Sequence, residues 1–238
     1  MTWMIIAVLC AYFIKGLCGF ANTLVFTSIL SFGINNVTIS PMELILGYPS
    51  NLIMAWKGRK ALDLKVCIPL AILVITGSVP GIFLLKNMET QVVKIFFGFV
   101  VVLIGLEMLL REYQSNQSKE SKVILMVIGI FSGVLCGLYG VGALLAAYVS
   151  RVTRSNESFK SNICVVFCVE NSFRILLYLA TGILQLQMVI QAITLMPLMM
   201  IGLWLGMNGC RFLDEKLVKK IVILMLILSG IALIITNL

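Results

Sequence analysis

Histidine is absent from this chain of 238 residues, and charged residues make up only 12% of it. The lack of an imidazole argues against His-ligated zinc or haem sites and against Ser-His or Cys-His nucleophile systems. A soluble domain contains about 25% charged residues, so this chain is short of the polar surface that a water-facing globule needs. The shortage of charge argues against soluble dehydrogenases, kinases and nucleic-acid-binding proteins, and no cofactor or metal is expected.

Disulfide and thiol-metal patterns are also missing. None of the seven cysteines forms a CxxC pair, and all lie within or at the edge of apolar runs. We expect them to be buried, reduced thiols that pack as small apolar groups. The first residues lack a basic stretch and an obvious small-residue cleavage site, so the sequence does not predict a removable signal peptide.

The chain is rich in long runs of apolar residues. Hydrophobic residues make up 61% of it, and its mean hydropathy is +1.09. About twenty apolar residues in a helix cross the roughly 30 Å of a bilayer core. The apolar runs are 1–33, 41–56, 65–86, 89–110, 121–150, 159–182, 184–209 and 215–237. The first and fifth are longer than one crossing needs and are broken by glycines, so each is one long tilted helix or two half-helices folded into a hairpin.

The positions of the cations decide between these alternatives. If all eight runs cross once, 7 Lys and Arg fall on the inner side and 9 on the outer, which is no bias. If the first and fifth runs enter and leave on the same side, the split becomes 14 to 2, as the positive-inside rule requires. This topology predicts a multi-pass protein of the cell membrane with both termini outside. Whether the hairpins are re-entrant or cross fully stays open at this point.

Internal repetition predicts the architecture. The motif Gly16-x-x-Gly19 matches Gly137-x-x-Gly140, and Asn51 matches Asn171 about 120 residues later. We expect a first repeat over 1–112 and a second over 121–238, joined by a polar cytoplasmic linker at 113–120. A hairpin plus three crossings is an odd number, which inverts the second repeat relative to the first. The predicted fold is therefore all-α and integral to the membrane, with two inverted repeats, each a glycine-broken helical hairpin plus three transmembrane helices.

The hairpin tips, residues 16–22 and 137–143, are the predicted site. A half-helix that starts at membrane depth presents unpaired N–H groups, which favour an anion, and glycine allows close approach of a ligand. The alternative is that these glycines only permit tight helix packing. The predicted substrate-binding residues are Lys15, Gly16, Cys18, Gly19, Asn22, Asn51, Cys136, Gly137, Tyr139, Gly140, Asn171 and Arg174.

Two cations, Lys15 and Arg174, lie inside apolar runs, where a charge is costly and faces a cavity or a partner. Arg174 follows Glu170 by four residues, so the two share a helix face and are expected to pair. The alternative hypothesis is that Glu170 is a proton-coupling carboxylate whose protonation frees Arg174 for an anion. Glu43 lies near the end of its run and is expected at the membrane interface.

These glycine tips resemble those of the sulfite exporter TauE/SafE family of membrane permeases, whose halves carry G-x-x-G-x-G-G-G and a later proline. The second half has Gly137-Leu138-Tyr139-Gly140-Val141-Gly142 and departs from the pattern at Ala143 and Leu144. The first has Gly16-Leu17-Cys18-Gly19 and departs from Phe20 onward. The resemblance implies transport of small anions such as sulfite, organosulfonates or other organosulfur compounds, driven by the proton gradient.

The predicted function is a secondary transporter that moves such an anion by alternating access. An anion channel that uses the same cavity is the alternative. An intramembrane enzyme or assembly partner is the third hypothesis, and the absence of histidine and of a serine nucleophile elbow argues against the enzyme. The expected partners are a small anion and the lipid bilayer, with no nucleic acid, and a homodimer is left open.

Overall fold

The structure is a computed structural model that describes residues 2–30, 36–87, 90–113 and 155–209, together with single residues and short runs between 130 and 153 and between 220 and 235. Within these residues every regular element is helical, which confirms the all-α class at that level. The elements are α1 (Thr2–Cys18), α2 (Asn22–Leu30), α3 (Asn36–Lys57), η1 (Arg59–Ala61), α4 (Leu64–Asn87), α5 (Thr90–Tyr113), α8 (Asn156–Ala180) and α9 (Leu186–Gly209).

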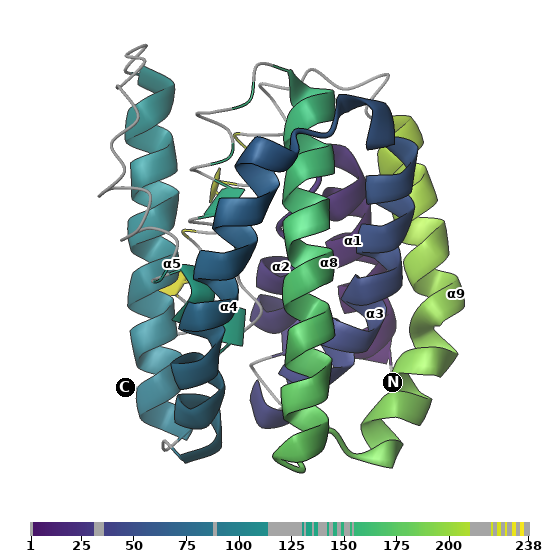
Figure 1. Ribbon diagram of the computed structural model, residues 1–238. Coiled ribbons are helices and arrows are strands. Elements are labelled where there is room, and N and C mark those ends of the chain that lie inside the picture. The colour runs from purple at the N-terminus through teal and green to yellow at the C-terminus, as the bar shows by residue number, and fades with distance from the viewer. Residues whose placement is uncertain are drawn as a thin grey trace.

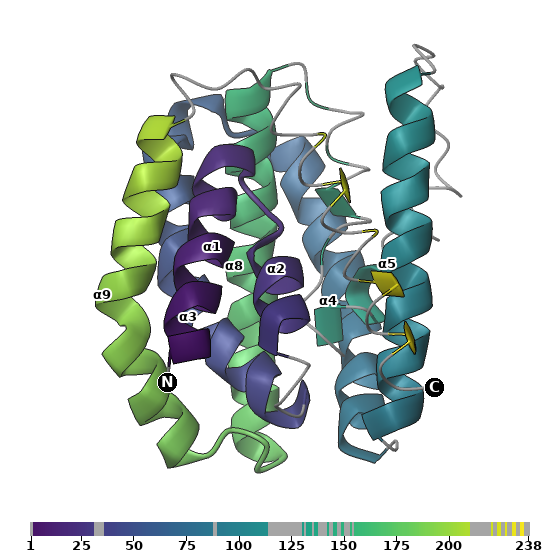
Figure 2. The ribbon, with the colours of Figure 1, turned by 180° about the vertical axis from the view of Figure 1, so that it is seen from behind.

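The long helices α3, α4, α8 and α9 run roughly parallel to one axis (Figure 1). Helix α8 packs against both α3 and α4, and α3 and α1 pack against α9. From behind, α1 and α2 lie in front of α3 and α8 (Figure 2). Asn51 of α3 and Asn171 of α8, which match in the predicted repeat, thus lie on two helices that pack together and run in opposite directions.

The first apolar run is a broken hairpin. Helix α1 rises from the N-terminus, the chain reverses at residues 19–21, and α2 runs back towards the end where α1 began (Figure 2). Gly19 has a φ of 88°, and Ala21 has a φ of 73°, a left-handed conformation that costs an L-residue about 1–2 kcal/mol. Helix α2, with 9 residues, is about 14 Å long and too short to cross a bilayer. The described part of this run is therefore two helices that fold back on each other at the tip.

The break begins three residues later than the glycine motif suggests. Lys15 and Gly16 are still helical, in the last turns of α1. A Cβ on Gly16 would lie 2.6 Å from the Leu203 carbonyl oxygen and 2.8 Å from the Gly206 carbonyl carbon, so Gly16 brings α1 against the backbone of α9. Gly137 is similar, because its Cβ would lie 3.1 Å from the Gly81 Cα of α4. Both glycines serve close helix packing, the alternative raised above.

Five of the apolar runs correspond to helices of the structure. The runs 41–56, 65–86 and 89–110 are α3, α4 and α5, and the runs 159–182 and 184–209 are α8 and α9. Helix α8 begins earlier than expected because the Ser155 side chain accepts a hydrogen bond from the Ser158 N–H and caps the helix. Most of the second hairpin (121–150) and of the last run (215–237) lies outside the described residues, as do Tyr139 and Gly140.

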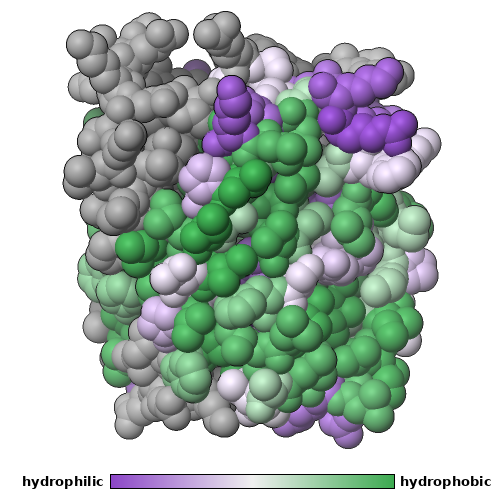
Figure 3. Space-filling view, in the orientation of Figure 1, coloured by the Kyte–Doolittle hydropathy of each residue, from purple (hydrophilic) through white to green (hydrophobic). Residues whose placement is uncertain are grey.

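Three of the described helices are long and apolar enough to span a membrane: Leu64–Phe83 of α4, Glu157–Ala180 of α8 and Leu186–Gly209 of α9. Large apolar side chains point outward from them, among them Ile72, Leu176 and Trp204. Figure 3 shows the result as a broad apolar surface between hydrophilic groups at the two ends of the molecule. In water this surface would be exposed, so lipid is the environment that fits it.

Candidate substrate site

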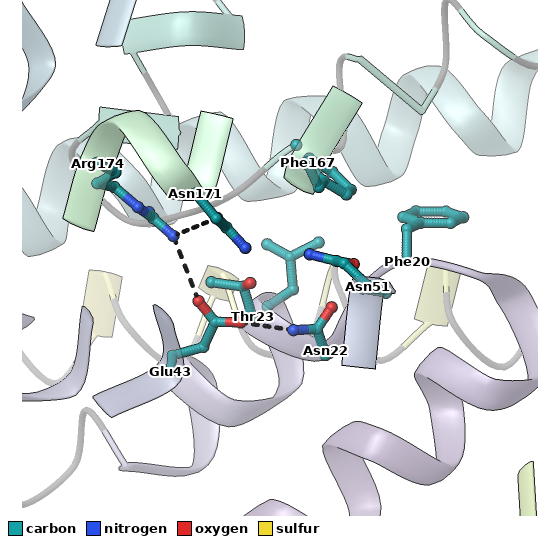
Figure 4. A pocket seen from close by; sticks show the side chains of 11 residues that line it. Phe20, Asn22, Thr23, Glu43, Asn51, Phe167, Asn171 and Arg174 are labelled. Atoms are coloured by element: carbon teal, nitrogen blue, oxygen red, sulfur yellow. Dashed lines mark hydrogen bonds and ion pairs between the residues drawn. The ribbon is translucent and has the colours of Figure 1, made fainter. Parts of the chain in front are cut away.

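A small pocket lies where the tip of the α1–α2 hairpin meets α3 and α8 (Figure 4). Its wall combines one guanidinium, one carboxylate and three amides with a smaller apolar side. The lining residues are Phe20, Ala21, Asn22, Thr23, Leu24, Glu43, Asn51, Gly142, Phe167, Asn171 and Arg174. Convergent polar groups fix the orientation of a ligand in a buried cavity, and this wall supplies several of them.

Arg174 is the centre of the polar side and is 1% exposed. Its Nη1 donates to the Cys136 carbonyl oxygen at 2.6 Å, and its Nη2 donates to Asn171 Oδ1 at 3.2 Å. The expected pairing with Glu170 is present, with Nε 3.5 Å from Glu170 Oε1. Nη2 also lies 3.7 Å from Glu43 Oε2, so one guanidinium stands between two carboxylates.

Glu43 corrects the expectation that it lies at the membrane interface. Its side chain is 3% exposed, and Oε1 accepts a 2.5 Å hydrogen bond from Asn22 Nδ2. The Thr23 hydroxyl lies beside the same carboxyl (Figure 4). The expectation failed because nearness to the end of an apolar run does not place a residue at the end of its helix. Helix α3 begins at Asn36, which puts Glu43 two turns inside it.

The matched asparagines meet at the pocket. Asn51 from α3 and Asn171 from α8 both line it (Figure 4). Asn171 is held by Arg174, whereas Oδ1 of Asn51 is buried and has no hydrogen-bond partner in the described part of the chain. Buried polar atoms without partners are rare in folded proteins, so at the pocket wall this acceptor is available to a donor group that enters the pocket.

The apolar side of the pocket comes from Phe20 and Phe167. Phe20 packs edge-on against Phe159 of α8, with ring centroids 5.8 Å apart. On the far side of the hairpin tip, a Cβ on Gly19 would lie 2.7 Å from Lys160 Cγ. The tip is thus pressed against the first turns of α8, which fixes its position between the pocket and the end of the molecule that carries Lys57 and Lys160.

The other predicted residues that the structure describes are not part of the pocket wall. Lys15 is 1% exposed; its Nζ is 5.9 Å from the centre of the Tyr12 ring, and no carboxylate of the described residues is within 4.0 Å. Among the rest, Cys136 contacts Arg174 through its carbonyl oxygen. The structure therefore brings Asn22, Asn51, Asn171 and Arg174 together at one cavity. Glu170 contacts Arg174 but is not part of the cavity wall.

Sequence reasoning missed Glu43, Thr23 and Phe167, whereas Phe20 lies within the predicted tip at 16–22. For Glu43 a signal was available, because Glu43, Ser50 and Asn51 are spaced at i, i+7 and i+8, which places them on one polar face of an otherwise apolar helix. For Thr23 and Phe167 the sequence holds no comparable signal, since aromatic and threonine side chains are common throughout apolar runs. No group of three or more Cys, Asp or Glu side chains suited to a metal ion occurs among the described residues.

Comparison with known proteins gives one match. The family model described as sulfite exporter TauE/SafE matches residues 4–233, nearly the whole chain. No curated protein and no solved structure matches it. The family is one of membrane transporters, in agreement with the apolar surface of α4, α8 and α9. A match over this length means that the chain belongs to the sulfite exporter TauE/SafE family.

Proposed function

We propose that this protein is a secondary transporter that moves a small anion, such as sulfite, an organosulfonate or another organosulfur compound, by alternating access. The observation that carries the proposal is Arg174, a buried cation at the wall of a polar pocket inside a membrane-spanning bundle. Such a charge is costly in a membrane interior and marks a substrate or ion pathway.

Several neutral donors support an anion as the ligand. The amides of Asn22, Asn51 and Asn171 line the same pocket, and each can donate to a sulfonate or sulfite oxygen. Helix α2 begins at Asn22, and its first turn, which lines the pocket, carries the partial positive charge of a helix N-terminus. Lys15 adds a second buried cation close by. The proposed coupling ion is a proton, and the carboxyls that contact Arg174, Glu43 and Glu170, are its candidate carriers.

The proposed reaction predicts uphill transport. Proteoliposomes containing the purified protein should accumulate sulfite, thiosulfate or methanesulfonate above the external concentration when a proton gradient is imposed, and carboxylates of similar size should compete less well. Radiolabelled uptake with and without a protonophore measures this. Uptake that never exceeds equilibrium would indicate the anion channel instead, and no uptake of any anion in the panel would contradict the proposed function.

For the architecture we propose two inverted repeats over 1–112 and 121–238 in the cell membrane, with the cationic end of the molecule in the cytoplasm. The antiparallel pair α3 and α8, which brings Asn51 and Asn171 to one pocket, supports this. Cations also gather at one end, where Ser161 Oγ donates to the Gly58 carbonyl oxygen and ties α8 to the loop after α3. This end carries Lys57, Arg59, Lys60, Lys65 and Lys160, whereas the turn at 181–185 carries none.

Sidedness is tested with two exposed positions, Lys60 in η1, which lies beside the first turns of α8, and Gln185, which follows the other end of α8. A membrane-impermeant maleimide added to intact cells should label Gln185→Cys and not Lys60→Cys, since only the first lies outside in this topology. Both should react in opened membranes. The parent chain with its native cysteines gives the background, and labelling of Lys60→Cys in intact cells would contradict the proposed orientation.

A further inference from the structure

We propose that Glu43 is the residue that couples proton and anion: its carboxylate occupies the anion's place at Arg174 and Asn22, and the anion binds when Glu43 takes up a proton. The inference rests on the proposed function and assigns the coupling role to one of its two candidate carboxyls. It follows from where the two lie. Glu43 lines the pocket, whereas Glu170 is not part of the wall.

Glu43 uses the donors that an anion in this pocket would need. Its Oε1 accepts from Asn22 Nδ2 at 2.5 Å, and its Oε2 is 3.7 Å from Arg174 Nη2. At the second distance the two groups form an ion pair but no hydrogen bond. Nη2 can therefore still donate a hydrogen bond on its pocket side. Gly47, one turn further along α3, leaves room for this carboxyl, because a Cβ there would lie 2.8 Å from Oε1.

Glu170 occupies a different position around the guanidinium. Its Oε1 lies 3.5 Å from Arg174 Nε and accepts a 3.4 Å hydrogen bond from Ser78 Oγ of α4. An anion at the pocket face of Arg174 would leave both contacts in place. Glu170 therefore acts as a lasting counter-ion of Arg174, and Glu43 as the one that exchanges with substrate.

The net charge of the groups around Glu43 explains why anion binding needs a proton. The groups that act on it are Lys15 and Tyr12 from α1, Asn22 and Thr23 from α2, Arg174, Glu170 and Tyr178 from α8, and Cys136. Helix α9, which also packs on α3, has no charged residue. With Lys15 and Arg174 cationic and both glutamates ionised the cluster is neutral, and an entering anion would make it negative in a medium of low dielectric.

Protonation of Glu43 removes that conflict. A proton from the aqueous phase binds the carboxylate, Arg174 and Asn22 are released, and the cluster gains one positive charge that a monoanion neutralises. On the other side of the membrane the anion leaves first and the proton follows, after which Glu43 returns to its pair with Arg174. The cycle moves one proton with each monoanion, in the direction that the combined gradients set, without net charge.

The test measures how pH affects anion affinity. The first substrate is methanesulfonate, a monoanion throughout; thiosulfate, a dianion whose uptake with one proton carries one net negative charge, replaces it if the sulfonate is not transported. The wild-type KM for uptake should rise about tenfold per pH unit above the pH at which Glu43 releases its proton. Glu43→Gln, which keeps the hydrogen-bond acceptor for Asn22, should make KM independent of pH and abolish proton-driven accumulation while exchange of labelled for unlabelled anion continues. Glu170→Gln is the matched control and should keep the slope.

Each other outcome decides the question. A pH slope that persists in Glu43→Gln, or disappears in Glu170→Gln, overturns the assignment of Glu43. If Glu43→Gln does not fold, Glu43→Asp replaces it: the slope should then begin at a different pH from wild type, and an unchanged starting pH overturns the inference. Failure of the wild-type protein to transport sulfite, thiosulfate or methanesulfonate would instead count against the proposed function.

Discussion

Replacing Arg174 by glutamine should reduce anion transport at least about a hundredfold and destabilise the protein by about 3–5 kcal/mol, because breaking a buried ion pair leaves uncompensated charge. Arg174 is in contact with Glu43 and Glu170, both nearly fully buried. In Arg174→Gln the net charge of the three side chains falls from −1 to −2. The initial rate of uptake in proteoliposomes and thermal unfolding in detergent measure the two effects.

Two further variants separate binding from stability. Asn51→Ala should raise KM about tenfold and leave thermal stability almost unchanged, because Asn51 Oδ1 has no partner to lose among the described residues. The double variant Arg174→Gln with Glu43→Gln restores the net charge to −1 and should recover stability but not transport. If Arg174→Gln alone transports normally, the anion is not held by the guanidinium.

The second large effect concerns the contact between α1 and α9. Gly206→Ala should lower the stability of the protein by about 2–3 kcal/mol, although alanine is the better helix former, because overpacking forces backbones apart. A Cβ at Gly206 would collide with the Phe13 carbonyl oxygen and lie 2.9 Å from the Gly16 Cα. Since α1 carries the hairpin tip, the displaced helix should also reduce transport. Thermal unfolding in detergent measures the stability change.

The same helix supplies the control for this prediction. At Gly209, less than one turn after Gly206, an added Cβ would be 3.6 Å from Leu17 Cδ2, an ordinary contact. Gly209→Ala should therefore leave stability unchanged or slightly increased. Equal losses in the two variants would show that the effect comes from helix α9 itself and not from its approach to α1.

Several features were predictable because they depend on local sequence. Apolar runs gave the positions of α3, α4, α5, α8 and α9, since about twenty apolar residues suffice to span a membrane in any context. The spacing of Glu170 and Arg174 predicted their pairing, because residues four apart in a helix share a face. The pairing of Glu43 with Asn22 and Arg174 was not predictable, as it joins three helices.

Composition and residue order place this chain in a membrane, show that it lacks the histidine on which many enzymes depend, and put Lys15 and Arg174 inside apolar segments. Which of these residues share a cavity depends on how the helices pack. Arg174 lines the pocket and Lys15 does not, and Gly16 packs against α9 while the chain reverses at Gly19. The reason is that hydropathy and helix period act along the chain, whereas the partners of a buried charge are set by how separate helices pack.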